Sequence, residues 1–405
     1  MTNRIRISLI SISLVLMSYV VVGGLLGKTE STSEKTYRDL GVYSEVLNRI
    51  KQEYVTDPDL KKVTDGAIRG LLESLDPYST YMTPAQYKDY LDHPDPGPAD
   101  VGVFLSKRLG YVTVVAVLPG GPADKAGIKP GDLIDEVDGV PSRQYSVTQL
   151  ERLMAGEAGS SIKLTVVRDG RTDPQSLTIT RAALNYPPVI SKMVEDGTGY
   201  MRVATFNKGK AREIAAKIKE LESQGARKIV LDLRNCAGGD VQEAVDTVSL
   251  FVDKGLVTYI AGQRFPRQDL EVHPSGPVCK LPLAVLINQS TAGPAELVAS
   301  ATLGNKRGEV VGVRSFGVGV YQKPIPVGDG SALLLAVAKY YGSDGKAISE
   351  NGVTPSVVQA PAGENESADE ENQPEGPEQF GGKDDLQLNK AIEILSQPAA
   401  PAKAA

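Results

Sequence analysis

Few side chains in this sequence could carry covalent or metal chemistry. The only histidines are His93 and His273, and their separation does not match the spacing of metal ligands. We interpret both as loop residues and expect no metal and no cofactor. Hydroxyl groups follow the apolar run LAVLIN at Ser290 and Thr291. Either one would act as a nucleophile only beside a base and an oxyanion site.

The two cysteines are Cys236 and Cys279, and the chain has no CxxC pair. Cys236 follows the apolar run 228–233, whereas Cys279 precedes the apolar run 281–288. If these runs are parallel strands, the two thiols lie at opposite ends, beyond the Cα separation of ~7 Å that a disulfide allows. We therefore predict that these cysteines form no disulfide with each other.

Strands and helices alternate from residue 199 onward. Apolar runs at 199–206, 228–233 and 283–288 are typical of strands, and the stretches 208–225, 240–253 and 294–304 are typical of helices. This alternation predicts an α/β core with a mostly parallel sheet. The strand runs are continuously apolar, which indicates that helices cover both faces of the sheet.

A smaller domain precedes this core. The Pro- and Asp-rich segment 92–100 indicates a boundary, and shorter β-branched runs follow up to residue 183. Pro122-Ala123 can begin a short helix that Gly127 ends. Asp138-Gly139 predicts a hairpin turn. The segment 98–183 is thus expected to be a small mixed domain.

Composition limits the function. The chain has 405 residues, 41% of them hydrophobic, and a net charge of −6. These values predict two or three folded domains and argue against binding to nucleic acid.

The N-terminus predicts a membrane anchor. Arg4 and Arg6 precede an uncharged run from 7 to 27, which spans about 30 Å as a helix. The basic flank predicts that the N-terminus stays in the cytoplasm and that the rest crosses the membrane. No A-x-A site follows, so we favour an uncleaved signal anchor at 1–28 over a removed signal peptide.

Three further segments complete the chain. Apolar residues at three- and four-residue spacing predict a helical element at 36–93, interrupted at Asp76-Pro77. The segment 361–382 is acidic and almost without apolar residues, which is typical of disorder. The segment 383–396 predicts one short amphipathic helix.

The run PGGPADKAGIKPGDLIDEVDGVP at 119–141 resembles the PDZ domains of bacterial periplasmic proteases. PDZ domains bind an extended C-terminal peptide as an added strand, and backbone N–H groups hold its carboxylate. The resemblance places the carboxylate loop at Val101-Gly102-Val103. The helix that contains Val147 and Leu150 would then line the side-chain pocket. A PDZ-like fold with a blocked groove is the alternative interpretation.

Several motifs resemble the C-terminal processing (tail-specific) serine peptidases. They are GAIRGLLESLDPYSTYM, LDLRNCAGGD, INQSTAGPAE, the segment from RSFGVGVYQ to GVTPS, and QLNKAIEIL. The resemblance implies an α/β peptidase core at 184–360, with a parallel or mixed sheet of the ClpP/crotonase type. It also implies an inserted PDZ domain at 98–183 and a soluble part in the bacterial periplasm or otherwise outside the cytoplasm.

The resemblance also assigns the catalytic positions. This family uses a serine nucleophile five residues after Asn288 and a lysine base 25 residues later, which fall on Gly293 and Val318. The oxyanion N–H that follows the nucleophile falls on Pro294, which has none. Gly238 and Gly239 keep the other half of the oxyanion hole, and the supporting Gln322 is retained.

Other residues are badly placed to replace this dyad. Ser290 and Thr291 lie three and two residues upstream of the nucleophile position, a displacement of roughly 6–10 Å along an extended chain. Lys306 and Lys323 are the candidate bases, and Lys323 should face away from Gln322. We therefore predict an inactive pseudopeptidase that binds protein C-terminal tails, associates with itself or regulates an active relative. The alternatives are a working serine endopeptidase with a rearranged nucleophile and a structural protein of the cell envelope.

Overall fold

The computed structural model describes residues 17, 32–93, 97–108, 110–168, 173–274, 276, 278–361 and 380–397. The predicted anchor at 1–28 lies outside these residues apart from Met17, and so does most of the acidic segment, from 362 to 379. Within the described ranges, no helix is long and apolar enough to cross a membrane. The chain divides into two compact units, 1–68 and 69–405.

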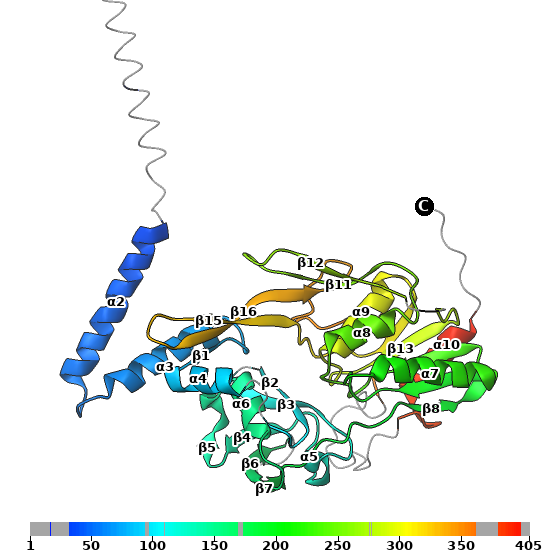
Figure 1. Ribbon diagram of the computed structural model, residues 1–405, viewed down its shortest axis with the longest axis horizontal. Coiled ribbons are helices and arrows are strands. Elements are labelled where there is room, and N and C mark those ends of the chain that lie inside the picture. Colours follow the sequence, from blue (N-terminus) through cyan, green and yellow to red (C-terminus); the bar gives the residue numbers. More distant parts are fainter. Residues whose placement is uncertain are drawn as a thin grey trace, which may run out of the picture. The chain divides into compact units, whose positions relative to one another are not determined.

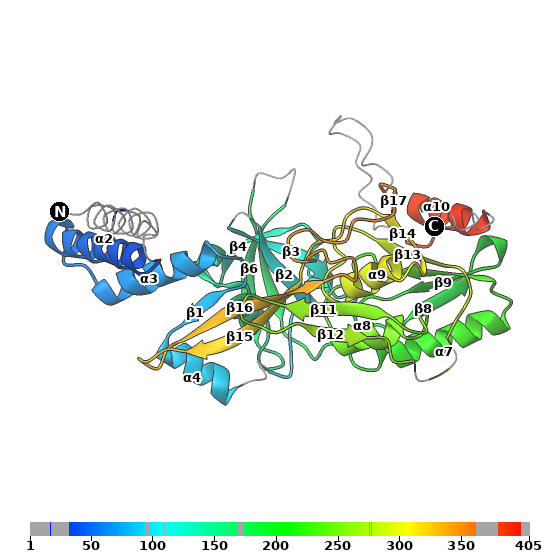
Figure 2. The ribbon, with the colours of Figure 1, turned by 90° about the horizontal axis from the view of Figure 1, so that it is seen from above.

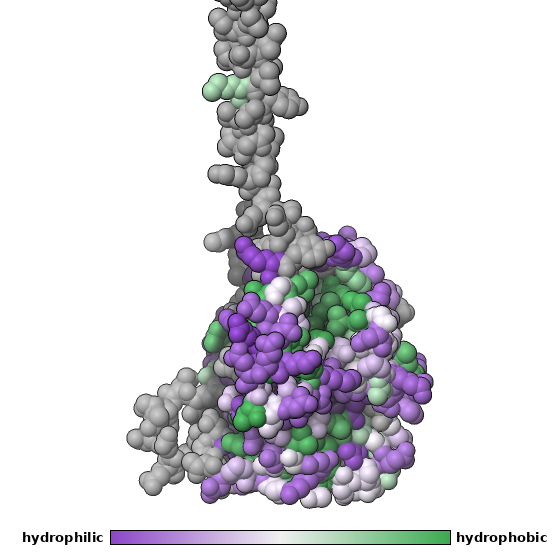
Figure 3. All heavy atoms as spheres, turned by 90° about the vertical axis from the view of Figure 1, so that its left-hand side faces the viewer, coloured by the Kyte–Doolittle hydropathy of each residue, from purple (hydrophilic) through white to green (hydrophobic). Residues whose placement is uncertain are grey.

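The first unit is helical. It contains α2 (Thr32–Glu53), which begins one turn before the predicted start, and the first part of α3 (Leu60–Glu73). Leu40, Val42 and Val46 of α2 are all more than half exposed. Hydrophobic side chains also lie among hydrophilic ones over the face drawn in Figure 3.

The small domain of the second unit is an antiparallel sheet with two helices (Figure 1). Its strands pair in the order β2-β3-β4-β6-β7, and β5 pairs with β4. The predicted turn is present, because Asp138 and Gly139 both have positive φ between β4 and β5. The bounds are β2 (Val103–Arg108), β3 (Tyr111–Val117), α5 (Pro122–Lys125), β4 (Leu133–Val137), β5 (Val140–Pro141), α6 (Val147–Met154), β6 (Ser161–Val167) and β7 (Gln175–Thr180).

The α/β core contains a six-stranded sheet in the order β17-β14-β13-β10-β9-β8. All its pairs are parallel except β8 with β9. The strands are β8 (Ile190–Met193), β9 (Thr198–Arg202), β10 (Lys228–Asp232), β13 (Leu283–Ile287), β14 (Gly308–Gly312) and β17 (Val357–Val358). Cys236 follows β10 and Cys279 precedes β13. Because these two strands are parallel, the two cysteines lie at opposite ends of the sheet, and both are free thiols.

Helices cover both faces of this sheet, as the apolar runs predicted (Figure 2). Ile229 and Leu231 of β10 pack into the cluster that includes α7 (Lys210–Ser223), α8 (Val241–Val248) and α9 (Pro294–Gly304). Val230 faces the opposite way and packs with α10 (Leu386–Ser396). The alternation follows from the two-residue period of a strand.

A buried ionic network fixes the chain where α10 begins. The Arg234 guanidinium donates to the carboxylates of Asp232 and Asp385, and both contacts are largely withdrawn from solvent. The Tyr200 hydroxyl donates to Asp232 at 2.7 Å. Breaking one of these contacts would leave a buried charge without a partner, which is costly. The network therefore holds the turn after β10 against the start of α10.

A third sheet is antiparallel and was not predicted from the sequence. It runs in the order β1-β16-β11-β12, and β15 pairs with β16. The strands are β1 (Thr80–Met82), β11 (Leu256–Ala261), β12 (Gln268–Glu271), β15 (Val320–Pro326) and β16 (Ala332–Tyr341). The predicted helical element at 36–93, interrupted at Asp76-Pro77, does not include the strand at 80–82, where Thr80 pairs with the distant Leu334. Helix resumes at α4 (Pro84–Asp92), which Thr83 caps.

Candidate functional site

Gly293 lies where β13 turns into α9, and its conformation is special. Its φ of 62° and ψ of −123° belong to a region that residues with a Cβ rarely adopt. A Cβ built at this position would meet no atom within 4 Å. The turn therefore has open space for a side chain at the position where the resemblance places a nucleophile.

Hydrogen bonds join this turn to the loop that follows β10. The Asn288 side-chain amide donates to Asn235 Oδ1 at 2.6 Å, and the Asn235 N–H donates back to Asn288 Oδ1 at 3.0 Å. The Ala292 N–H donates to the Cys236 carbonyl. The fold thus brings together the turn at Gly293 and the glycine pair at 238–239.

Thr291 serves this same architecture. Its hydroxyl donates to the Leu233 carbonyl at 2.8 Å and accepts from the Asn288 N–H, and the side chain is fully buried. A hydroxyl held by a carbonyl and shielded from solvent is a poor nucleophile.

Glu296 connects the nucleophile turn with the loop at 315–318. Its carboxylate is fully buried and accepts four hydrogen bonds, from the N–H groups of Gly293, Gly317 and Val318 at 2.8–2.9 Å and from the Ser315 hydroxyl at 2.5 Å. Desolvation raises the pKa of Glu296 to about 7, and these four donors oppose the rise. One carboxylate therefore links the turn at Gly293 to the loop at Val318.

Val318, at the position of the base, belongs to an apolar cluster. The cluster joins two strands of the small domain to the core loops and comprises Phe104, Val115, Ala116, Ala237, Ala292, Phe316 and Val318. An isopropyl group carries no lone pair, so this position cannot accept a proton.

The small domain covers the oxyanion side of the site. A Cβ built at Gly238 would lie 1.8 Å from Cε1 of Phe104, so the phenyl ring packs directly on this glycine. Within the described ranges, the N–H groups of Gly238 and Gly239 donate no hydrogen bond. Pro294 is the first residue of α9 and has no N–H, so of the donors expected for an oxyanion hole only those of Gly238 and Gly239 could serve.

Gln322 supports the N-terminal segment of the second unit. Its side-chain amide donates to the Tyr78 carbonyl at 2.8 Å. Lys323, the next residue, is exposed and so faces away from Gln322, as expected for a strand. Lys306 has a positive φ in the turn after α9. The amine of Lys339, on the neighbouring strand β16, is paired with Glu350 at 3.2 Å.

In the small domain, the expected carboxylate loop is already hydrogen bonded. The Gly102 N–H donates to the side chain of Asp100 at 2.6 Å. Burial raises the pKa of the Asp100 carboxyl, while the N–H groups of Gly102 and Val101 oppose the rise. Val101 is fully buried and Val103 is half-buried. The loop has the N–H groups of a carboxylate site, and Asp100 occupies at least one of them.

The helix expected to line the groove is α6. Val147 is buried, and Leu150 lies in the domain core with no exposed surface. Glu151 follows Leu150 on this helix. Desolvation and then the negative charge of Asp100 raise the pKa of Glu151 to about 7. The groove thus has two acidic side chains near its carboxylate loop.

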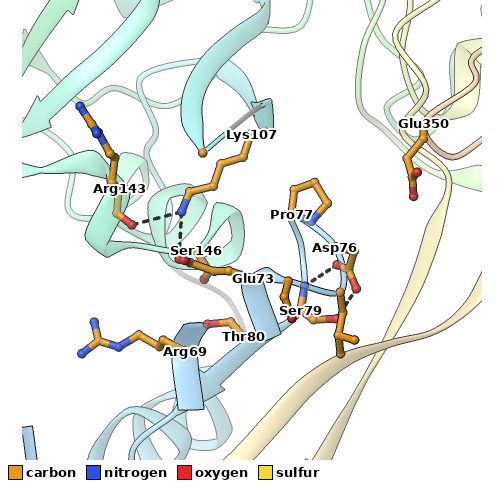
Figure 4. A pocket seen from close by; sticks show the side chains of 13 residues that line it. Arg69, Glu73, Asp76, Pro77, Ser79, Thr80, Lys107, Arg143, Ser146 and Glu350 are labelled. Atoms are coloured by element: carbon orange, nitrogen blue, oxygen red, sulfur yellow. Dashed lines mark hydrogen bonds and ion pairs between the residues drawn. The ribbon is translucent and has the colours of Figure 1, made fainter. Parts of the chain in front are cut away.

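A cavity of about 580 Å³ opens at the other end of β2 and α6 (Figure 4). Lys107 of β2 reaches toward Glu73 at 3.5 Å and donates to the Arg143 carbonyl at 3.3 Å. Ser146, the N-cap of α6, lies beside them. Desolvation lowers the pKa of the Lys107 ammonium. The residues that line this cavity are Arg69, Glu73, Ser74, Leu75, Asp76, Pro77, Ser79, Thr80, Lys107, Gly110, Arg143, Ser146 and Glu350.

Family models match most of the chain. Peptidase family S41 matches residues 197–359, a PDZ domain matches 113–168, and the activating protease CtpB N-terminal domain matches 23–85. The carboxy-terminal-processing protease of Bartonella bacilliformis is 31% identical over 395 residues, covering 91% of this chain and 90% of that one. The chain belongs to the C-terminal processing peptidases of family S41.

Other family members agree in sequence and fold. Carboxy-terminal processing protease CtpA of Bacillus subtilis is 32% identical over 332 residues, covering 82% of this chain and 70% of that one. The solved structure of a photosystem II D1 C-terminal processing protease matches with a TM-score of 0.64 and 28% identity, covering 78% of this chain and 92% of that chain. The fold is therefore an S41 peptidase core with an inserted PDZ domain.

Three residues of this S41 chain were not identified from its sequence: Glu296, Phe104 and Asp100. Glu296 carries a detectable signal, because it is the single charged residue of helix α9. Phe104 and Asp100 carry no such signal, because a phenylalanine in a strand and an aspartate in a loop are both common. No group of three or more acidic, histidine or cysteine side chains is arranged to hold a metal ion within the described residues.

Proposed function

We propose that this chain is a non-catalytic member of the S41 family, which captures protein C-terminal tails through its PDZ domain. The observation that carries the proposal is the pair Gly293 and Val318, which offers neither a hydroxyl nor an amine. Loss of one member of a catalytic unit commonly costs on the order of 10⁶ in turnover, and here both positions are substituted.

Two contacts support this proposal over an enzyme with a rearranged nucleophile. The Thr291 hydroxyl is committed to the Leu233 carbonyl. Phe104 and Val318 share one apolar cluster, so the place of the acyl group is lined by hydrocarbon. A hydroxyl there would find no free base, because the Glu296 carboxylate at this turn already accepts four hydrogen bonds.

The rest of the proposal concerns location and partners. The uncharged run at 7–27 anchors the chain in the bacterial inner membrane, with the soluble part in the periplasm or otherwise outside the cytoplasm. There the chain binds protein tails and associates with an active relative or with itself.

A labelling experiment tests the absence of catalysis. The full chain, in detergent micelles, is treated with a fluorophosphonate probe and separately with an unfolded protein that has an apolar C-terminus. We expect neither labelling nor cleavage. The matched positive control is the triple variant Gly293→Ser, Pro294→Ala, Val318→Lys, which restores nucleophile, oxyanion N–H and base in a turn with space for the new side chain.

The result that overturns the proposal is labelling of the unaltered chain that disappears in Ser290→Ala or Thr291→Ala. Such labelling would establish the enzyme with a rearranged nucleophile. Tail binding is tested separately, by substituting Gly102 with valine. A Cβ at position 102 would come within 3.3 Å of Leu118 and Leu184, and the backbone φ of +80° is one that valine rarely adopts. The loop must therefore change shape, and we expect tail binding to be lost.

A further inference from the structure

The carboxylate loop of the PDZ domain contains a carboxylate of its own chain. Asp100 directly precedes the loop, and its Oδ1 accepts the Gly102 N–H at 2.6 Å. The Val101 N–H also stabilises the charged form of this side chain. These N–H groups are the donors that a bound tail would use for its terminal carboxylate.

The main chain of Asp100 holds this side chain in register with the loop. The Asp100 N–H donates to the Ala182 carbonyl at 3.0 Å, and the Ala182 N–H donates back at 3.2 Å. The residue is thus pinned to the end of the domain, and only its side chain is free to rotate away from Gly102.

We propose that Asp100 is an internal occupant of the tail-carboxylate site, so that a protein tail binds only by displacing it. The inference rests on the proposed tail binding and deepens it. It makes Asp100 the residue that sets how strongly a free C-terminus competes for the groove.

The charges around Asp100 should make its side chain leave the Gly102 N–H more readily when the Asp100 carboxyl is protonated. Glu151 of α6 is close enough for the two negative charges to interact, and Arg181, after β7, acts on Asp100 with the opposite sign. The Arg181 guanidinium is itself directed at α6, where it donates to the carbonyls of Leu153 and Met154. An incoming tail carboxylate would add a third negative charge beside Asp100 and Glu151.

The sign of the pH dependence follows from these charges. Burial raises the pKa of Asp100, and its N–H donors lower it. A displaced Asp100 side chain that the bound tail keeps covered loses only the lowering contribution and meets the charge of the tail carboxylate, which raises its pKa further. Tail binding therefore takes up protons, and affinity rises as the pH falls toward the pKa of Asp100. A terminal α-carboxyl has a pKa of about 3.5, so the tail stays ionised across this range.

The experiment uses the full chain and a fluorescein-labelled peptide that ends in Leu-Ala-Val, as the free acid and as the C-terminal amide. Fluorescence anisotropy gives the Kd between about pH 7.5 and about pH 5.5. For the free acid we expect affinity to rise at the lower pH, by at most about a hundredfold for one proton over two pH units, and for the amide we expect no change. At the higher pH, Asp100→Asn should bind the acid about tenfold more tightly than the unaltered chain, and Asp100→Gly at least as tightly.

Matched variants identify the responsible group. Asp124 is another loop aspartate of the same domain, and it accepts the Gly120 N–H at 2.7 Å. Asp124→Asn should leave both the Kd and its pH dependence unchanged. A pH dependence that persists in Asp100→Asn and disappears in Glu151→Gln would overturn the assignment to Asp100.

Failure of the inference differs from failure of the proposed function. If the acid binds the unaltered chain, Asp100→Asn and Asp100→Gly with one Kd at all pH values, tail binding stands and the inference is wrong. If no peptide binds even Asp100→Gly, whose loop is open, both are wrong.

Discussion

The peptidase cleft and the PDZ groove each contain a carboxylate that accepts backbone N–H groups, but the two carboxylates differ in burial. Glu296 has no exposed surface and accepts four hydrogen bonds from two loops. Asp100 is half-buried and accepts from its own loop. A fully buried carboxylate with four donors has no alternative partner, whereas a side chain at the surface can exchange its donors for water.

The comparison explains what each site has kept. Glu296 still holds the turn at Gly293 against the loop at Val318, so the cleft keeps its geometry without the residues of the dyad. In the PDZ domain, Asp100 accepts the Gly102 N–H, and we propose that it controls access to the donors of this loop. The proposed loss of chemistry at one site therefore would not imply loss of binding at the other.

The largest effect should come from removing the Glu296 carboxylate. Glu296→Ala leaves four buried donors without an acceptor, and we expect the free energy of unfolding to fall by about 4 kcal/mol. Urea denaturation of the full chain measures this. Glu393→Ala removes an exposed carboxylate of α10 and should change stability by less than about 0.5 kcal/mol. Equal effects of the two variants would show that Glu296 does not organise the cleft.

The next effect is the pH dependence that Glu296 confers. The pKa of Glu296 is raised from 4.5 to about 7, so between these values the folded chain binds more protons than the unfolded chain. Stability should therefore fall as the pH rises through this window, by at most about 3 kcal/mol.

Glu296→Gln lacks this titration. The difference in unfolding free energy between the unaltered chain and Glu296→Gln should thus shrink from about pH 5 to about pH 8. A difference that stays constant with pH would mean that Glu296 remains ionised throughout. In that case the four hydrogen bonds to Glu296 would outweigh the effect of burial on its pKa.

A smaller effect should come from the contact between the two sites. Phe104→Ala removes the half-buried ring that packs on Gly238, which we expect to cost about 2 kcal/mol. Hydrogen exchange at the N–H groups of 237–239 should accelerate, because the small domain no longer covers them. Tyr111→Ala, which removes an exposed ring elsewhere in the same domain, is the matched control. Unchanged exchange in Phe104→Ala would show that the ring does not close the cleft.

Local pattern predicted the elements that carry a continuous apolar run or a turn motif of their own. Continuous apolar runs identified β9, β10 and β13, and the turn residues Asp138-Gly139 identified the β4–β5 hairpin. The strand β1 was missed, because three residues carry too little pattern and their partner in β16 lies more than 250 residues away. The helical spacing of the apolar residues that precede this strand favoured helix instead.

The sequence alone determined the family, the inserted PDZ domain and the identity of the side chains at Gly293 and Val318, because side-chain chemistry at a motif position does not depend on packing. Only the tertiary structure decided what surrounds them. Glu296 acquires its four donors, Phe104 its place on Gly238, and Asp100 its position in the carboxylate loop through folding. Each of these contacts joins groups that no local spacing relates.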